Sequence, residues 1–358
     1  MESQPQFIRF LKKMFLYYKV GVPRMTFKTG SKMLGYFIKT KFLKRQIPWL
    51  LEFSITYACQ CKCIHCSVSK YEKSRPNILT NEAIKKVLDQ VAAIGIPKVD
   101  FFGGEPLLRK NIADLVAHGA KLGLYMSITS NGWLLSRDMI QDLKRAGIHC
   151  INISIDSDDA ATHDRLRGKS GIFAKATEAI KTCQAEGIPC IASTYVTKEN
   201  DINFGRGAKD DSNLARIIGL TKELRATGLR ILFPIISGQW EEDKGKEYSE
   251  EDKANVIKNL EPSFAFIEGA YSVKNGKKIC QTLIGKMFNI SPEGNLQLCV
   301  AFPDTFGNVK NKPLKELLHG MYTHPTYCDN QGSNCCSTRD LIREKKDSSK
   351  EFLGSYRC

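Results

Sequence analysis

The stretch from Leu51 to Ser67, LEFSITYACQCKCIHCS, joins a mostly apolar run to four cysteines that fall within eight positions. The apolar part is short and contains β-branched and aromatic residues, which predicts a β-strand over residues 51–57. Cys59, Cys63 and Cys66 then stand in a C-x3-C-x2-C pattern, with Cys61 as an additional thiol. Three thiolates on one loop suit a soft metal centre, either zinc or an iron–sulfur cluster.

The spacing of the cysteines bears on which of these two centres is present. Structural zinc usually takes four ligands from paired C-x2-C knuckles. This loop contains one such pair. A zinc site would also need Cys61 or His65 as a ligand, and the short loop would then have to wrap tightly around the ion. A cubane cluster held by three thiolates instead leaves one iron open, and catalysis needs an open coordination position. We therefore expect a catalytic iron–sulfur centre directly after the first strand.

The composition is that of an ordinary globular protein. The 358 residues are 42% hydrophobic and 25% charged, and no apolar run approaches the ~18 residues of a membrane-spanning helix. The first residues carry charges through their only apolar run and lack a small-residue cleavage site, so they do not resemble a secretory signal. Thirteen cysteines in a chain of this size favour metal ligation over disulfides. We predict a cytoplasmic protein.

The first fifty residues carry most of the net charge of +15. They contain eleven Lys and Arg side chains against a single acid, Glu2, and so contribute +10. Apolar residues recur near helical spacing in 7–16 and 33–42, which predicts two basic amphipathic helices. Such helices can bind an acidic partner or lie on an anionic membrane, here by contact of residues 1–45 with its inner face. Alternatively, they pack their apolar faces on the main domain and leave their lysines in water.

Beyond residue 48, short apolar runs alternate with amphipathic stretches. The runs predict strands at 51–57, 98–103, 125–130, 150–155, 190–196 and 230–235. Six strand and helix units in this order predict an α/β fold whose parallel sheet curls into a full or partial barrel. Further along, ISPEGNLQLC at 290–299 predicts a β-hairpin. We therefore expect a basic helical segment over 1–48, a barrel over 49–238, and a linker with a small α+β domain over 239–358.

Three further motifs fall at the ends of predicted strands: GGEP at 103–106, TSNG at 129–132 and SIDS at 154–157. Functional groups of parallel barrels gather at the carboxyl ends of the strands, and the cysteine loop stands at the same end. The order and spacing of the four motifs resemble the radical S-adenosylmethionine (radical SAM) enzymes over roughly residues 50–236. The resemblance implies a partial (β/α)6 barrel.

The resemblance also implies a cofactor set. Cys59, Cys63 and Cys66 would hold a [4Fe–4S] cluster whose open iron site takes the amino and carboxylate groups of S-adenosylmethionine. The residues that would bind S-adenosylmethionine are Gly103, Gly104 and Glu105 at the methionyl amino group, Ser130, Asn131, Ser154 and Asp156 along the ribose and methionine, Arg165 at the carboxylate and His65 beside the adenine. His65 departs from the aromatic residue usual at its position, although an imidazole can still stack. Taken singly, these motifs also fit a strand-end turn, a helix cap or a surface ion pair.

Cysteines return near the carboxyl end. Cys280, thirteen residues, Gly294, four residues and Cys299 resemble the opening of a SPASM or twitch domain, the auxiliary-cluster extension of many radical SAM enzymes. This implies an auxiliary [4Fe–4S] cluster whose remaining ligands come from a late set that departs from the full pattern: Cys328, Cys335, Cys336 and Cys358. Structural zinc, or no metal, is the alternative.

The expected activity is reductive cleavage of S-adenosylmethionine to a 5′-deoxyadenosyl radical that abstracts hydrogen from a substrate. SPASM-like enzymes act mostly on peptides and proteins, so we expect a peptide or protein side chain, presented by a separate leader-recognition protein, and a flavodoxin or ferredoxin as electron donor. One alternative is a lipid, isoprenoid or small metabolite modified at the membrane surface. Another is a non-enzymatic, metal-bearing nucleic-acid-binding protein, which leaves GGEP, TSNG and SIDS unexplained.

Overall fold

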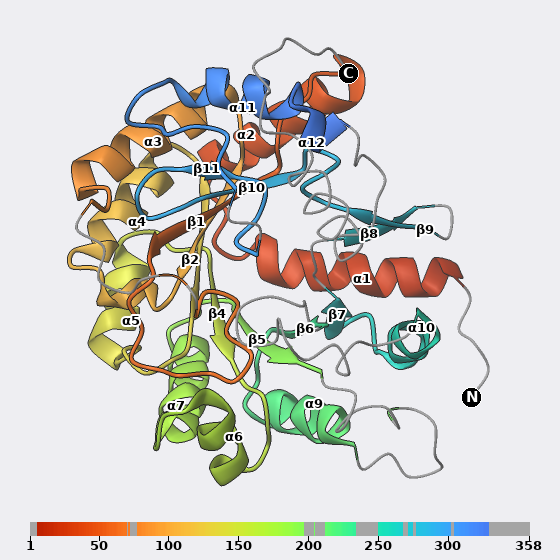
Figure 1. The fold of residues 1–358 in the computed structure, drawn as a ribbon. Helices are drawn as coiled ribbons and strands as arrows, with labels where there is room; N and C mark the ends of the chain where they lie inside the picture. Colours follow the sequence, from red (N-terminus) through yellow and green to blue (C-terminus); the bar gives the residue numbers. More distant parts are fainter. Residues whose placement is uncertain are drawn as a thin grey trace, which may run out of the picture.

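The computed structural model describes residues 6–69, 71, 77–196, 204, 212–233, 250–267, 271–274, 277–301 and 304–328. Its strands in this part of the chain are β1 (Leu50–Thr56), β2 (Lys98–Gly103), β3 (Tyr125–Ser130), β4 (Cys150–Ser154), β5 (Cys190–Tyr195), β6 (Gly228–Leu232), β7 (Ala265–Ile267), β8 (Tyr271–Lys274), β9 (Lys277–Cys280), β10 (Met287–Ile290) and β11 (Leu296–Gln297). Nine of them form one sheet in the order β11-β10-β1-β2-β3-β4-β5-β6-β7 (Figure 1). From β10 to β7 all neighbours are parallel, and β11 runs antiparallel to β10.

Helices connect the strands, and several of them cover the outer face of the sheet (Figure 1). They are α1 (Gln6–Gly21), α2 (Phe27–Phe37), the π-helix η1 (Ile38–Phe42), α3 (Asn81–Ile94), the 3-10 helix η2 (Pro106–Leu108), α4 (Ile112–Lys121), α5 (Arg137–Arg145), α6 (Ala160–Arg167), α7 (Ile172–Ala185), α9 (Asn213–Glu223), α10 (Glu250–Asn259), α11 (Leu314–Tyr322) and α12 (Pro325–Cys328). One continuous core of aliphatic and aromatic side chains lies between these helices and the strands. The fold is the α/β partial barrel that the strand order predicted.

All six predicted barrel strands form; β2 and β3 have the predicted bounds, and the other four differ by at most three residues at an end. The predicted hairpin also forms: Asn289 and Ile290 of β10 pair with Gln297 and Leu296 of β11, and Gly294 in the turn has a φ of 95° that favours glycine. Strand β7 was not predicted, and β10 was predicted only from Ile290 onward, as part of the hairpin. They extend the same sheet past residue 238, so the segments on either side of that predicted boundary share one sheet.

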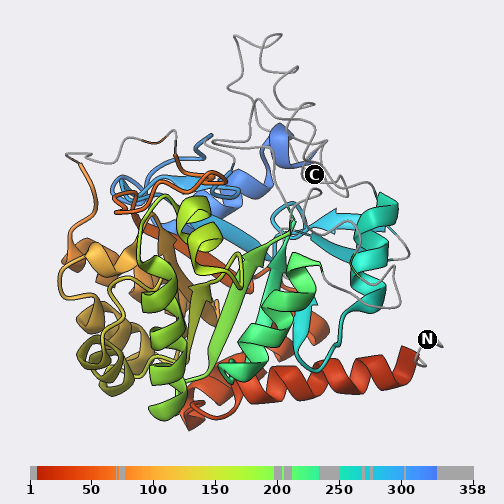
Figure 2. The ribbon, with the colours of Figure 1, turned by 90° about the horizontal axis from the view of Figure 1, so that it is seen from below.

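The two amino-terminal helices lie across the amino ends of the barrel strands. Val20 and Met33 pack against Tyr125 and Ile191, near the starts of β3 and β5, and the Tyr125 hydroxyl donates to the Val20 carbonyl at 3.0 Å. The cysteine loop follows the carboxyl end of β1, so the helices and the loop occupy opposite ends of the barrel (Figure 2).

For α1, the alternative in which the helix turns its apolar face to the main domain is wrong, whereas α2 buries Tyr36 and packs Met33 against the sheet. Leu16 is the buried apolar side chain of α1, whereas Phe7, Leu11 and Phe15 are exposed. Most of the apolar surface of α1 therefore faces away from the barrel.

His149 fixes α2 to the sheet as a neutral imidazole. The Met126 amide donates to His149 Nδ1 at 3.1 Å, and Nε2 lies 3.3 Å from the Thr29 hydroxyl of α2. Because Nδ1 accepts, a proton there would face another N–H group. Burial and the nearby Arg24 charge together lower the pKa of His149 to about 4.

Acidification is therefore expected to weaken the fold through His149. Between pH about 6.5 and 4 the unfolded state binds a proton at this residue that the folded state does not, so stability falls as the pH falls. At pH 5 this costs roughly 1–2 kcal/mol relative to pH 7. Urea unfolding at both pH values should show a smaller pH effect for His149→Gln than for the unsubstituted protein. An equal pH effect in the two proteins would contradict this assignment.

Candidate active site at the carboxyl ends of the strands

The cysteine loop is held between two other loops by backbone hydrogen bonds. On one side, the amides of Gly104 and Glu105 donate to the carbonyls of Thr56 and Ala58, both at 2.8 Å. On the other side, the Lys62 amide donates to the Arg167 carbonyl at 3.0 Å, and the Ile64 amide donates to the Leu166 carbonyl at 3.1 Å. The backbone thus places the thiols between the end of β2 and the end of α6.

Glycine at the start of GGEP permits this close approach. Gly103 has a φ of 132°, and a Cβ added there would lie 2.1 Å from the Thr56 carbonyl oxygen. Glycine at this position therefore lets the backbone of GGEP contact the cysteine loop. This role is separate from the predicted contact of GGEP with a ligand. A side chain at Gly103 would separate the two loops.

Polar side chains surround the sulfur atoms of the loop. Asn131 Nδ2 lies 3.7 Å from Cys59 Sγ, and Arg167 donates from Nη1 to Cys63 Sγ at 3.8 Å. A hydrogen bond from Cys61 and the Arg167 charge, acting against burial, lower the pKa of Cys63 to about 7. Thiolates are what an iron–sulfur cluster requires as ligands, so this donor set fits the cluster.

A cubane cluster spreads its ligands over several irons, so its thiolates need not converge on one point. In the described part of the chain, no three or more His, Cys, Asp or Glu side chains are placed to hold a single metal ion.

Glu105 connects GGEP to TSNG. Its side chain is fully buried; Oε1 accepts from the Ser130 hydroxyl at 3.0 Å and from the Leu107 amide at 3.1 Å, and Oε2 accepts from the Asn131 amide at 2.9 Å. Burial raises the pKa of Glu105 to about 7 despite these bonds. Three predicted site residues are therefore in direct contact, and Glu105 holds the other two in place.

Asp156 lies in a second buried cluster, with a partner that the sequence analysis did not select. Its Oδ2 is 2.7 Å from Arg167 Nε and 3.5 Å from His65 Nε2. Burial alone would raise the pKa of Asp156, but the Arg167 charge, helped by His65, holds it below its usual range. His65 also packs on Tyr195, with ring centroids 4.6 Å apart. Ser154 is buried on β4, two residues before Asp156.

Arg165 does not join these residues. Its side chain is exposed on α6, whereas Arg167, two positions later, is only 8% exposed and contacts both Asp156 and Cys63. Arg167 therefore replaces Arg165 as the arginine of the candidate site.

A further set of polar side chains crosses the inner face of the sheet. Asp100 of β2 accepts from Ser127 at 2.5 Å and Thr129 at 2.8 Å on β3, and Asn152 of β4 bonds Thr129 at 3.2 Å. Sequence analysis missed these residues. Their signal was the alternation of polar and apolar residues along β2, β3 and β4, which places the polar ones on the face opposite the helices.

The carboxyl-terminal hairpin lies beside the cysteine loop. Tyr71 stacks on Tyr57 with centroids 4.5 Å apart, and its hydroxyl donates to the carbonyl of Val300, next to Cys299, at 2.9 Å. Cys299 and Cys280 are both buried, and Cys280 Sγ lies 2.8 Å from the Thr282 hydroxyl oxygen. Cys328 ends α12 and is disulfide-bonded. Cys335, Cys336 and Cys358 lie outside the described residues.

Comparison with known proteins agrees with this geometry. Residues 53–206 match the model of the Radical SAM superfamily. An AdoMet-dependent heme synthase of Methanosarcina barkeri is 26% identical over 296 residues, which cover 75% of this chain and 82% of that protein. An Fe-coproporphyrin III synthase of the same organism is 32% identical over 160 residues, which cover 45% of this chain and 40% of the relative.

Solved structures share the fold at lower identity. SuiB of Streptococcus suis, bound to its precursor peptide SuiA, superimposes with a TM-score of 0.62 and 18% identity over 82% of this chain and 69% of SuiB. anSMEcpe with bound AdoMet gives a TM-score of 0.57 and 17% identity over 75% of this chain and 77% of that one. The cofactors of the radical SAM family, which matches residues 53–206, are a [4Fe–4S] cluster and S-adenosylmethionine. The chain thus contains a radical SAM domain over residues 53–206, and the relatives named above are enzymes.

Proposed function

We propose that this enzyme abstracts a hydrogen atom from a substrate held at the carboxyl ends of the barrel strands. When bound, the cluster and S-adenosylmethionine supply one-electron cleavage to methionine and a 5′-deoxyadenosyl radical, which becomes 5′-deoxyadenosine by taking hydrogen from the substrate. The observation that carries the proposal is the joining of the cysteine loop to GGEP and to the end of α6 by backbone hydrogen bonds. An electron donor such as flavodoxin or ferredoxin supplies the electron.

The residues of the site divide between the two cofactors. Cys59, Cys63 and Cys66 hold the cluster. The S-adenosylmethionine site comprises the residues already predicted, with Arg167 in place of Arg165: Gly103, Gly104, Glu105, Ser130, Asn131, Ser154, Asp156, His65 and Arg167. Glu105 and Asp156 act partly by positioning, because their carboxylates already accept hydrogen bonds or pair with a cation within the protein.

Two substrate classes are supported by different observations. A peptide or protein side chain, with a separate leader-recognition protein, is favoured by the fold shared with SuiB in its complex with SuiA. An iron porphyrin is favoured by the named heme synthase relative, which aligns over three quarters of the chain. A lipid entering through the amino-terminal helices is disfavoured, because these helices lie at the end of the barrel opposite the cysteine loop.

An auxiliary [4Fe–4S] cluster is part of the proposal, with Cys280 and Cys299 as two of its ligands. The contact of Tyr71 with the carbonyl next to Cys299 supports a position near the first cluster. Cys280→Ala with Cys299→Ala should lower the iron content of the anaerobically reconstituted protein from about eight to about four atoms. Unchanged iron content would remove the auxiliary cluster while leaving the first cluster in place.

The decisive experiment measures 5′-deoxyadenosine after anaerobic reconstitution, reduction with dithionite and addition of S-adenosylmethionine. Formation of 5′-deoxyadenosine is expected, and its absence in the iron-loaded protein would overturn the proposal. Stimulation of its formation by iron coproporphyrin III or by a cysteine-containing precursor peptide then distinguishes the substrate classes. Deuterium transferred from a labelled substrate into 5′-deoxyadenosine would identify the carbon that is attacked.

A further inference from the structure

The exposed apolar side chains of this protein are concentrated in its first helices. Of the eighteen large apolar side chains that are exposed among the described residues, fifteen lie between Phe7 and Leu43. Phe7 is 69% exposed and Phe27 is 93% exposed. Large continuous apolar patches are uncommon on proteins that do not dock on another surface.

Helix α1 is attached to the barrel by its less apolar side. Phe7, Leu11, Met14, Phe15 and Tyr18 follow helical spacing along one face, and all are exposed. The opposite side carries Leu16, which is buried, and Arg9, whose guanidinium donates to the carbonyls of Ile257 and Lys258 at the end of α10, both at 2.9 Å. An amphipathic helix in a globular domain usually buries its apolar face; this helix presents that face to the outside.

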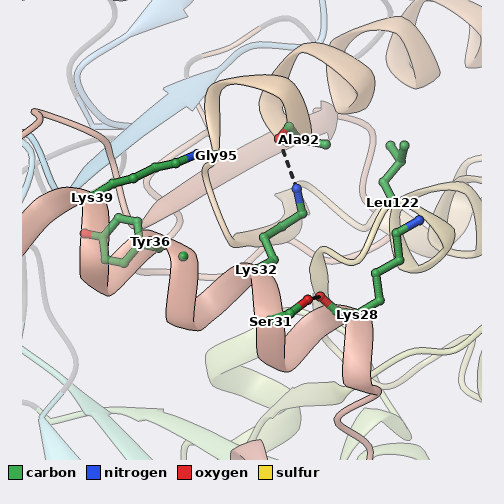
Figure 3. A pocket seen from close by; sticks show the side chains of 9 residues that line it. Lys28, Ser31, Lys32, Tyr36, Lys39, Ala92, Gly95 and Leu122 are labelled. Carbon is green, nitrogen blue, oxygen red and sulfur yellow. Dashed lines mark hydrogen bonds between the residues drawn. The ribbon is translucent and has the colours of Figure 1, made fainter.

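Helix α2 is held in the same way. Lys32 donates to the Ala92 carbonyl at 3.0 Å and Lys28 to the Lys121 carbonyl at 2.5 Å, so these lysines bond to carboxyl-terminal turns of α3 and α4. They line a pocket of about 320 Å³ between α2 and the barrel helices (Figure 3). Leu34 and Phe37 of α2 are exposed. Helix α2 also buries Tyr36 and packs Met33 against the sheet, so it carries apolar side chains on both sides, whereas α1 presents most of its apolar side chains outward.

The charge of this surface is of one sign. The sequence has no Asp or Glu between Glu2 and Glu52. Beside the apolar side chains, further basic residues are exposed and do not contact the barrel carbonyls named above: Lys13, Lys19, Lys41, Lys44 and Arg45. Lysines that flank an apolar face can place their stems along it and their charged ends at anionic headgroups.

We propose that the outer face of α1, α2 and η1 docks in the plane of an anionic phospholipid bilayer. An anionic surface fits both the outward apolar face and the exclusively basic charge beside it. Helix α1 has sixteen residues and is therefore about 24 Å long. None of the helices that the structure describes is long and apolar enough to cross a membrane, so docking is peripheral. The inference does not depend on the proposed function.

Vesicle flotation tests the proposal on the full chain. Vesicles of phosphatidylcholine mixed with phosphatidylglycerol should carry the protein upward, and vesicles of phosphatidylcholine alone should carry much less. Raising the salt concentration should weaken binding to the anionic vesicles, since it screens the exposed lysines. Absence of binding to the anionic vesicles would overturn the proposal.

Variants with matched controls separate the contributions of charge and apolar contact. Neutralising Lys13, Lys19 and Lys41 with glutamine should lower the partition coefficient roughly fivefold per lysine, or about a hundredfold together. The same change at Lys86, Lys181 and Lys315, which are exposed on α3, α7 and α11, should have a much smaller effect. An equal loss in the two triple variants would indicate that net charge alone drives binding and would overturn the docking surface.

The apolar contact has its own matched pair. Leu11→Ser with Phe15→Ser should lower the partition coefficient at least about tenfold. Ile78→Ser with Leu108→Ser, which changes two exposed apolar side chains outside these helices, should leave binding unchanged. Because all four side chains are exposed, the fold should survive, and circular dichroism checks this. Light scattering tests the other occupant of this face, a second copy of the chain. If the protein fails to bind vesicles and forms a dimer, and if the double substitution Leu11→Ser and Phe15→Ser dissociates that dimer, the proposal is overturned and the face is a dimer interface.

Discussion

Replacing Cys59, Cys63 and Cys66 together with alanine is expected to remove about four irons from the reconstituted protein and to reduce cleavage of S-adenosylmethionine to background. These thiols stand on the loop that backbone hydrogen bonds hold between GGEP and the end of α6. Without thiolates the first cluster has no ligands on this loop, and the electron needed to break the sulfonium bond cannot be delivered. Iron counting and 5′-deoxyadenosine detection on the same preparation measure both effects.

Cys61 provides the matched control within the loop. Its side chain is buried. In the sequence it lies between two of the proposed ligands, but it is not part of the C-x3-C-x2-C pattern. Cys61→Ala should therefore retain the iron and the cleavage activity. Loss of the cluster in Cys61→Ala, or its retention in the triple variant, would show that the ligand set is assigned incorrectly.

Arg167→Met is the second change with a large expected effect. It leaves the Asp156 carboxylate buried without the guanidinium that lies 2.7 Å away, and removing one partner of a buried ion pair typically costs about 3–5 kcal/mol. It also removes the donor to Cys63 Sγ. We expect a lower urea midpoint and at least a roughly hundredfold slower formation of 5′-deoxyadenosine, if one to two charge-assisted contacts to the cofactors are lost.

Two further variants separate stability from function at this site. Arg165→Met changes an exposed arginine on the same helix, and should leave stability and cleavage nearly unchanged. Combining Arg167→Met with Asp156→Asn removes the unpaired charge, so part of the stability should return while cleavage stays slow. If cleavage recovers along with stability in the double variant, Arg167 acts only through the fold. If Arg165→Met lowers stability and cleavage as much as Arg167→Met does, Arg167 is wrongly assigned as the arginine of the site.

The choice between Arg165 and Arg167 shows what sequence reasoning could and could not reach. Two residues along an α-helix are about 200° apart around its axis, so these side chains point in nearly opposite directions. Which one faces the site depends on the rotation of α6, which begins after its cap at Asp159. The motif predicted that an arginine belongs there, but the eight-residue helix lacks an apolar stripe strong enough to set its orientation.

The amino-terminal helices show a related difficulty. Spacing of apolar residues predicts that α1 has an apolar side, but it does not say whether that side meets the protein or the outside. The answer depends on contacts distant in sequence, such as the bonds from Arg9 to the end of α10. By contrast, β1 to β6 and the hairpin predicted at 290–299 could be found in the sequence, because each follows from local periodicity or from a local turn.

Strand β10 could not be predicted as a neighbour of β1 for the same reason, and this pairing bears on how the protein folds. Leu50 to Phe53 of β1 pair with Met287 to Ile290 of β10, and contacts between such distant residues form late because closing a long loop costs entropy. During synthesis, the strand that leads into the cysteine loop is therefore an open edge of the sheet until β10, Met287–Ile290, has emerged. An open edge can pair with another chain, so completion of β10 protects the newly made enzyme from aggregation at the strand beside its iron site.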